Sequence, residues 1–233
     1  MKTNANFKTP KTLSLPLFLT LMVAVIAFLA SCHTNVNNQI PPAGVMAVNS
    51  AQGSSAQDFY LDNAKSNSSP ILYTQSQGYF YITAGDTHQA QFKTSGSAVV
   101  NASTSLQLSP GGFYDVVLTD NNGTSTYPND RTSPQPGNSR VRFINVSAGF
   151  TANADFAYSV SGKATVLASN VANKAASAYY DVSGTINNFS FSATGSTSVL
   201  LNIPITLQAG KIYTIFISGT TQATLASTIV AEN

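Results

Sequence analysis

The strongest constraint on the fold of this chain is an internal repeat. Residues 79–97, "YFYITAGDTHQAQFKTSGS", align without a gap on residues 178–196, "AYYDVSGTINNFSFSATGS". The same register carries residues 106–120 onto residues 205–219. The identical positions are glycines at expected turns and aromatic residues in expected strands: Tyr81/Tyr180, Gly85/Gly184, Phe92/Phe191, Gly96/Gly195, Gly111/Gly210 and Tyr114/Tyr213. Two copies of one folding unit are therefore predicted.

Within each copy, apolar residues recur with a period of two, which is typical of β-strands and not of helices. Residues 154–160 and 199–207 alternate in this way. Residues 212–217 are β-branched or aromatic on both faces, which predicts a central strand. Pro204 has no N–H to donate, so its strand is expected at a sheet edge or at a bulge. This pattern gives about seven short strands in each copy, as in a small β-sandwich.

The predicted fold class is all-β, with two tandem antiparallel β-sandwich domains of the immunoglobulin-like type. A small closed barrel is the alternative. A segment rich in Pro, Asn, Ser and Thr separates the copies and predicts a linker, although the last hairpin of the first copy is an alternative for part of it. The predicted boundaries are a signal peptide at 1–31, a tether at 32–43, a first sandwich at 44–120, a linker at 121–138 and a second sandwich at 139–233. The predicted core residues include Phe92 and Phe191, Val100 and Val199, and Leu108 and Leu207.

The N-terminus has the pattern of a secreted lipoprotein. Three lysines precede an apolar run at 17–30, which is shorter than the roughly 20 residues of a spanning helix and fits a signal peptide. Leu29-Ala30-Ser31-Cys32 resembles the lipobox of bacterial lipoproteins, which implies cleavage before Cys32 and acylation of Cys32. This is the only cysteine in the chain, so an internal disulfide is excluded. An ordinary signal peptide with a chance cysteine is the alternative.

The second copy resembles the bacterial domain of unknown function 4397. It has "RVRFINVSAG", "DFAYSVSG", "ASAYYDVSGT" and "ITLQAGKIYTIFISG" in the order that is typical of this domain. The resemblance covers residues 139–230 and, more weakly, residues 44–120, where "VMAV" replaces "VRFI". It implies the fold of each copy, but no biochemical activity is established for the family.

The sequence offers few groups for catalysis. It holds nine acids and two histidines, His33 in the predicted tether and His88 between two predicted strands. No spacing supplies the three or four ligands of a metal site, and no nucleophile elbow is present. The loop "DNNG" (120–123) offers oxygen ligands for calcium, but Asp, Asn and Gly also favour turns. We therefore predict that the protein is not an enzyme and needs no cofactor and no metal.

Four tyrosines of the first copy could form a binding face: Tyr60, Tyr73, Tyr79 and Tyr81. Aromatic rows of this kind bind sugars, whereas tyrosines that merely pack the outer part of a sandwich are the alternative explanation. The chain has no Trp, the usual sugar platform. An exposed coplanar row would favour a glycan site, and burial would favour a spacer.

These patterns predict a non-catalytic, lipid-anchored cell-envelope protein of tandem β-sandwich modules, with a structural or protein-binding role. The alternative is a glycan-binding lipoprotein that uses the four tyrosines. The expected partners are the membrane, through the N-terminal lipid, and envelope proteins or glycans. Nucleic acid is excluded because charged residues are only 9% of the chain and no basic patch occurs. The predicted location is the outer membrane, with the side that it faces left open.

Overall fold

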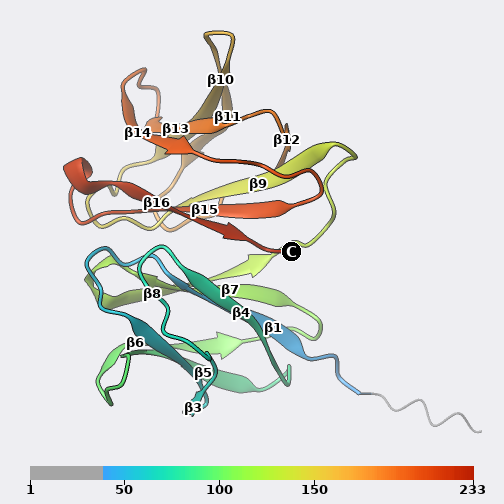
Figure 1. The fold of residues 1–233 in the computed structure, drawn as a ribbon, viewed down its shortest axis with the longest axis vertical. Helices are drawn as coiled ribbons and strands as arrows, with labels where there is room; N and C mark the ends of the chain where they lie inside the picture. Colours follow the sequence, from blue (N-terminus) through green and yellow to red (C-terminus); the bar gives the residue numbers. More distant parts are fainter. Residues whose placement is uncertain (1–38) are drawn as a thin grey trace, which may run out of the picture. The chain divides into compact units, whose positions relative to one another are not determined.

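The structure is a computed structural model that describes residues 39–233 (Figure 1). The predicted signal peptide, the lipobox with Cys32 and most of the tether lie outside the described residues. The described part of the chain has two short 3₁₀ helices, η1 at Asp120–Asn122 and η2 at Gln222–Thr224. Between residues 39 and 233, no helix has the length and apolar character that crossing a membrane requires.

Each repeat contributes eight strands. The strands of the first repeat are β1 (Ala43–Asn49), β2 (Gln57–Leu61), β3 (Ala64–Lys65), β4 (Ser76–Ile82), β5 (Thr87–Thr94), β6 (Val100–Gln107), β7 (Phe113–Thr119) and β8 (Gly123–Asn129). The strands of the second repeat are β9 (Asn138–Asn145), β10 (Ala154–Val160), β11 (Lys163–Val171), β12 (Tyr180–Ser183), β13 (Asn188–Ala193), β14 (Val199–Pro204), β15 (Ile212–Ser218) and β16 (Ala226–Ala231).

The strands of each repeat form two four-stranded sheets with matching orders. Sheet A is β4-β1-β7-β8 and sheet B is β3-β2-β5-β6, while sheet C is β12-β9-β15-β16 and sheet D is β11-β10-β13-β14. The prediction of two tandem β-sandwiches is confirmed. The prediction that they are antiparallel is wrong in one respect, because β1 pairs with β7 and β9 with β15 in parallel. A parallel pair needs a long connection, which the five strands between its members provide.

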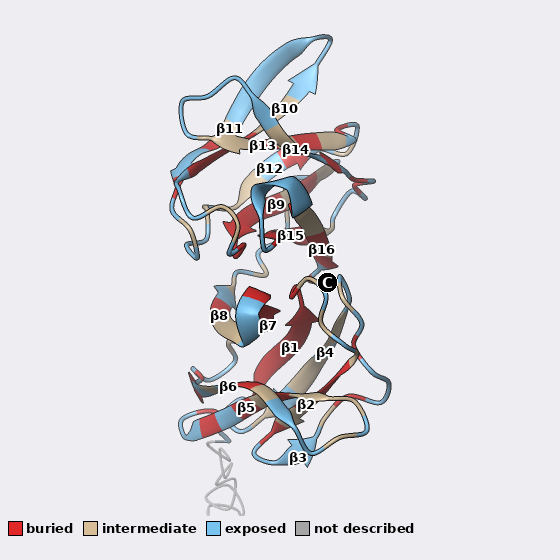
Figure 2. Ribbon diagram, turned by 90° about the vertical axis from the view of Figure 1, so that its left-hand side faces the viewer, coloured by how far each residue is buried: buried red, intermediate tan, exposed pale blue. Residues whose placement is uncertain are grey.

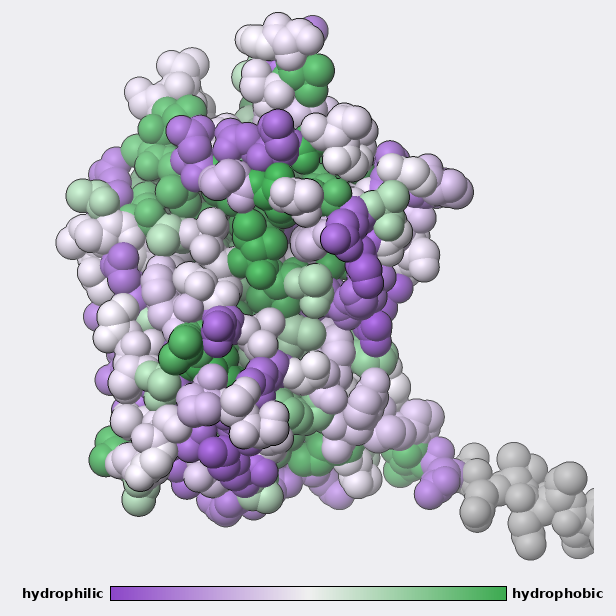
Figure 3. All heavy atoms as spheres, in the orientation of Figure 1, coloured by the Kyte–Doolittle hydropathy of each residue, from purple (hydrophilic) through white to green (hydrophobic). Residues whose placement is uncertain are grey.

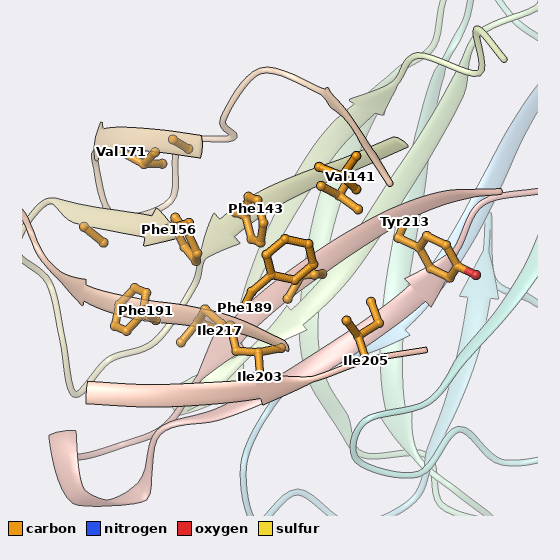
Figure 4. Packing of buried hydrophobic residues seen from close by; sticks show 14 of the residues in the cluster. Val141, Phe143, Phe156, Val171, Phe189, Phe191, Ile203, Ile205, Tyr213 and Ile217 are labelled. Atoms are coloured by element: carbon orange, nitrogen blue, oxygen red, sulfur yellow. The ribbon is translucent and has the colours of Figure 1, made fainter. Parts of the chain in front are cut away.

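An apolar core fills each sandwich. In the second repeat, the rings of Phe143 and Phe156 stack with their centroids 4.5 Å apart, and further buried aromatic and aliphatic side chains surround them (Figure 4). In the first repeat, Phe59 and Phe92 lie with their centroids 5.1 Å apart. Aromatic pairs at these distances add to the free energy of apolar burial. Each repeat therefore has a core of its own.

The predicted core residues Phe92, Phe191, Leu108 and Leu207 are buried, as expected. Val100 and Val199 are not, because 44% and 51% of their surfaces are exposed. Each of the two valines begins an edge strand, and a shift in register separates it from the next pair of the ladder. Such a bulge interrupts the alternation of side chains. The period of two therefore gave the wrong face at these two positions.

The sheets are stacked in the order B, A, C, D, so that sheets A and C are covered on both faces (Figure 2). Every residue of β1 and of β15 is buried for this reason. The prediction of a central strand at 212–217 is confirmed, since β15 lies between β9 and β16. Pro204 lies on β14, at the edge of sheet D, as its missing N–H requires.

The segment predicted as a linker is partly a strand. Residues 123–129 form β8, which pairs antiparallel with β7 at the edge of sheet A. This is the alternative in which the last hairpin of the first repeat extends into the segment. Residues 130–137 then lead to β9.

The gapless alignment of the repeats is shifted by one residue in one strand. Val45 and Val141 occupy equivalent places, opposite Tyr114 and Tyr213. Their other neighbours are Phe80 and Tyr180, so Tyr180 corresponds to Phe80 and not to Tyr81. The connection between β4 and β5 is therefore one residue longer than its counterpart in the second repeat.

The burial pattern predicts different costs for two truncations in the second repeat. Phe191→Ala should lower the free energy of unfolding by about 3–5 kcal/mol, because it empties part of a packed core. Val199→Ala should change it by less than about 0.5 kcal/mol, because the side chain is mostly exposed. Denaturant unfolding followed by circular dichroism measures both. Equal losses for the two variants would contradict the bulge at the start of β14.

Candidate functional site

The buried charged and polar groups of the protein concentrate where sheet A meets sheet C. We call one group of six residues the interface cluster: Tyr79, Asp115, Asn129, Arg142, Thr214 and Glu232. Three of them belong to the first repeat and three to the second. Apolar side chains of both sheets pack around the cluster, among them Met46, Val117, Ile144 and Phe216.

Arg142 on β9 is the only cation of the interface cluster, and its guanidinium reaches into both repeats. Its Nε donates to Thr214 Oγ1 at 2.9 Å, and its Nη2 donates to Asp115 Oδ2 at 3.0 Å. Its Nη1 donates to the Pro128 carbonyl at 2.6 Å, and Nη2 also contacts Asn129 Oδ1. Because Asp115, Pro128 and Asn129 belong to the first repeat, these bonds join the two sandwiches.

Glu232 is the second anion of the cluster. Its Oε2 accepts from the Tyr79 hydroxyl at 2.5 Å and from Asn129 Nδ2 at 2.9 Å, and its Oε1 accepts from Thr214 Oγ1 at 2.5 Å. Burial raises the pKa of the Asp115 carboxyl well above its usual range, and the nearby Glu232 carboxylate adds to this effect. Burial also raises the pKa of the Tyr79 hydroxyl. The Arg142 guanidinium therefore binds Asp115 directly and is linked to Glu232 through the Thr214 hydroxyl.

The cluster occupies equivalent positions of the two repeats. Asp115 corresponds to Thr214 in the repeat alignment, and Met46 corresponds to Arg142. Asn129 and Glu232 also correspond, because each lies opposite the first residue of its β7 or β15 strand. The same face of each repeat therefore contacts the other, which is the pattern of an isologous interface, but the two faces differ in charge.

Asp120 forms a second contact between the repeats. Its carboxylate accepts the N–H of Gln52 at 2.8 Å, of Gly219 at 2.7 Å and of Ala148 at 3.3 Å. Gln52 and Ala148 are equivalent residues of the two repeats. The carboxylate that suggested a calcium loop in "DNNG" is therefore occupied by backbone donors. Within residues 39–233, no group of three or more Asp, Glu, His or Cys side chains is placed to hold a metal ion.

Two other buried acids fix turns inside their own sandwiches. Asp58 on β2 accepts the N–H of Gly96, and Asp155 on β10 accepts the N–H of Gly195 at 2.9 Å. Both glycines have positive φ, at 74° and 75°, in the hairpin that follows β5 or β13. A glycine adopts this conformation without steric cost. These acids therefore hold corresponding hairpins, and Asp155 also lines a groove on the outer face of sheet D.

His88 is held between two acceptors. Its Nδ1 lies 2.7 Å from Asp62 Oδ2, and its Nε2 lies 2.6 Å from the Thr83 carbonyl oxygen. Only the doubly protonated ring can donate to both. The hydrogen bond to Asp62 raises the pKa of His88, and the N–H of Gln89 together with His88 lowers the pKa of Asp62.

The four predicted tyrosines do not share one face. Tyr60 lies on β2 of sheet B beneath Lys93, whose Nζ is 4.1 Å from the ring centroid. Tyr73 and Tyr79 bond through their hydroxyls to Ser218 and Glu232 of the second repeat. Tyr81 is 64% exposed and stands alone among them in this respect. Two of the four residues therefore serve the contact between repeats.

A groove of about 340 Å³ opens beside Asp120, between the two repeats. Its lining includes Asn121, Val146 and Lys174. General acid–base chemistry needs titratable groups in reach of one another and of a substrate. The Asp120 carboxylate is already held by three backbone donors, so this groove brings no such pair together.

Fold and site together define a protein of two β-sandwiches joined face to face. Residues 43–152 match a family model described as a domain of unknown function (DUF4397). The resemblance to this domain is thereby confirmed. The match spans the first repeat and β9, whereas the stronger resemblance was expected at 139–230.

No curated protein matches the chain. Among solved structures, the C-terminal domain of AlgF from P. aeruginosa is 21% identical, with 41% of this chain and 99% of that chain covered and a TM-score of 0.30. A family 26 carbohydrate-binding module of Eubacterium rectale Amy13K, in complex with maltoheptaose, is 10% identical, with 82% and 97% covered and a TM-score of 0.28. These scores are too low to transfer a ligand or an activity to this chain.

Replacing Arg142 should test the interface cluster. Arg142→Met introduces the residue found at the equivalent position, Met46, and leaves two buried carboxyl groups without a cation. We expect a loss of about 3–5 kcal/mol in the free energy of unfolding. Arg140→Met is the control, because Arg140 pairs with Asp130, whose side chain is half-exposed, and such a surface pair should contribute less than about 1 kcal/mol. Neutralising the acids as well, with Asp115→Asn and Glu232→Gln, should recover part of the loss. Equal effects of the two arginine variants would contradict the role of the cluster.

His88 predicts a pH dependence of stability. Because its pKa is raised in the folded state, the contribution is complete below about pH 6.5, the ordinary histidine value, and is lost as the pH rises through the folded value. In residues 39–233 His88 is the sole histidine, so the difference between wild type and His88→Gln in denaturant unfolding from about pH 5 to pH 8 isolates the effect. His88→Gln should flatten the profile, and an unchanged slope would show that another group causes it.

Proposed function

We propose that this protein is a non-catalytic, lipid-anchored module of the cell envelope with a structural or protein-binding role. The observation that carries this proposal is the use of the buried acids. All five buried acids form hydrogen bonds that hold turns or join the repeats: Asp58, Asp115, Asp120, Asp155 and Glu232. Groups that are fully engaged in this way are not available for proton transfer to a substrate.

The contact between the sandwiches supports a spacer. Apolar packing, the interface cluster and Asp120 fix sheet A against sheet C at several separate points. A connection through a flexible linker alone would let the domains move independently. The tandem therefore acts as one stiff unit that can hold a binding surface at a set distance from a lipid anchor at Cys32.

The arrangement of the tyrosines favours the structural or protein-binding role over glycan binding. A sugar platform needs exposed rings side by side, and here Tyr60 lies on sheet B while Tyr79 and Tyr81 lie on β4 of sheet A. The hydroxyl of Tyr79 is bound within the interface cluster. Tyr81 alone offers an open ring.

One experiment tests the anchor and the class of ligand together. The full-length protein, expressed in a Gram-negative host, should fractionate with the outer membrane and carry acyl mass on Cys32, whereas Cys32→Ala should be released by gentle washing, because acyl chains provide the membrane affinity. Retention of Cys32→Ala in the membrane would contradict the anchor. Reproducible binding of residues 33–233 to glycans, abolished by Tyr81→Ala, would contradict the protein-binding role.

A further inference from the structure

Strand β11 is a long, open edge strand. With nine residues it is the longest strand within residues 39–233, and it lies at the edge of sheet D. Proteins commonly shorten edge strands or place proline or charge on them, because open edges pair with other chains. Here β3 has two residues, β12 has four, and β8 and β14 carry Pro128 and Pro204. The edge strands β4, β6 and β16 also lack proline and charge, but they are shorter than β11, with seven, eight and six residues. From Ala164 to Val171, β11 has neither proline nor charge.

The equivalent edge of the first repeat is closed by a side chain. After the short strand β3, Asn67 folds back on β2, where its Oδ1 accepts the N–H of Phe59 at 2.7 Å and its Nδ2 donates to the Ser69 carbonyl at 2.7 Å. Asn67 is itself buried. In the second repeat a full strand takes this place, and its first four residues are exposed. The two repeats therefore differ at this edge.

The hairpin between β10 and β11 fixes which backbone groups point outward. Ser161 and Gly162 form a two-residue turn with positive φ at both positions, 51° and 78°, as in a type I′ hairpin. The flanking residues Val160 and Lys163 then form a hydrogen-bonded pair, and bonding alternates along the ladder. Lys163 and Thr165 therefore bond to β10, while Ala164 and Val166 direct their N–H and C=O groups away from it.

The geometry points to a second copy of this chain as the occupant of the β11 edge, paired antiparallel with β11 across a two-fold axis at Thr165. Ala164 of each copy then exchanges both backbone hydrogen bonds with Val166 of the other. The two copies of Thr165 face each other, which is a favourable cross-strand pair. Lys163, the only charged residue of the strand, lies opposite Leu167, so the two ammonium groups are at opposite ends of the pairing.

The surface beside this edge suits a partner without charge. Val166 is 55% exposed and shares a groove with Ala157, Ala164, Ser190 and Val199 on the outer face of sheet D. The charged residue of this lining, Asp155, already accepts hydrogen bonds from Ser169, Asn170 and Gly195. Figure 3 shows apolar residues at the surface around β14 and toward the tip of the β10–β11 hairpin. Pairing of two β11 strands would cover Val166 and join two copies of sheet D into one continuous sheet. The regular part of β11 ends before Asn170, whose positive φ of 58° turns the chain.

Sedimentation velocity of residues 33–233, which contain every strand of the fold, tests this pairing over a concentration series. The wild-type fragment should form a dimer as its concentration rises. Val166→Pro should abolish the dimer, because it removes an outward N–H and leaves the bonds between β10 and β11 in place. Val100→Thr is the control, because Val100 is an exposed valine on β6, at an edge of sheet B in the other repeat, and the dimer of this variant should persist.

Circular dichroism of each variant shows whether the fold is retained. If Val166→Pro loses strand content, Val166→Lys replaces it, since this change adds a charge near the strand pair without altering the backbone. The proposal is overturned if the wild-type fragment stays monomeric at all concentrations. It is also overturned if a folded Val166 variant still forms the dimer. The outcome is independent of the lipid anchor, because the fragment lacks Cys32.

Discussion

The packing of sheet A against sheet C is the contact on which the rest of the structure depends. Without this contact, sheet A of the first sandwich and sheet C of the second would each expose one face to solvent, with Val48, Val117, Ile144 and Phe216 at the surface. Exposed apolar patches of this kind are rare in stable monomeric proteins. The demand for cover on both faces explains why β1 and β15 are fully buried strands. It also explains why the tandem behaves as one body with four layers.

The interface cluster specifies how the two sheets meet. A buried ion pair adds little stability compared with well-packed apolar residues, because both charges must leave water. The pair does exclude other arrangements of the two sheets. If sheet C shifted along sheet A, the Arg142 guanidinium would lose its hydrogen bonds to Asp115 and Pro128, while Thr214 moves with it on sheet C. The apolar residues of the interface thus supply most of the attraction, and Arg142 selects the register. We infer that this division of roles keeps the spacing of the tandem constant.

Much of the fold could be predicted from the sequence, because the strand period and the repeat are local or regular signals. Phe92 and Phe191 are in the cores where the alignment placed them. The predicted burial of Val100 and Val199 was wrong because a bulge interrupts the alternation of side chains next to each valine, and no residue type in the sequence marks these bulges. The interface cluster was missed because Asp115, Arg142 and Glu232 are far apart in sequence. A polar residue within a strand that is otherwise apolar on both faces, such as Arg142 in "VRFIN", is the signal that could have revealed it.

The differences between the repeats decide which faces can pair. In an isologous contact the same surface patch of both partners meets. If two copies of the first repeat packed in this way, the interface would bury two Asp115 carboxyl groups and no arginine. Burial of unpaired charge costs several kcal/mol. The second repeat brings Arg142 in place of Met46 and Thr214 in place of Asp115. This combination gives Asp115 a cation and links that cation through Thr214 to Glu232. The first sandwich therefore requires the second one as its partner, and covalent linkage guarantees that it meets it.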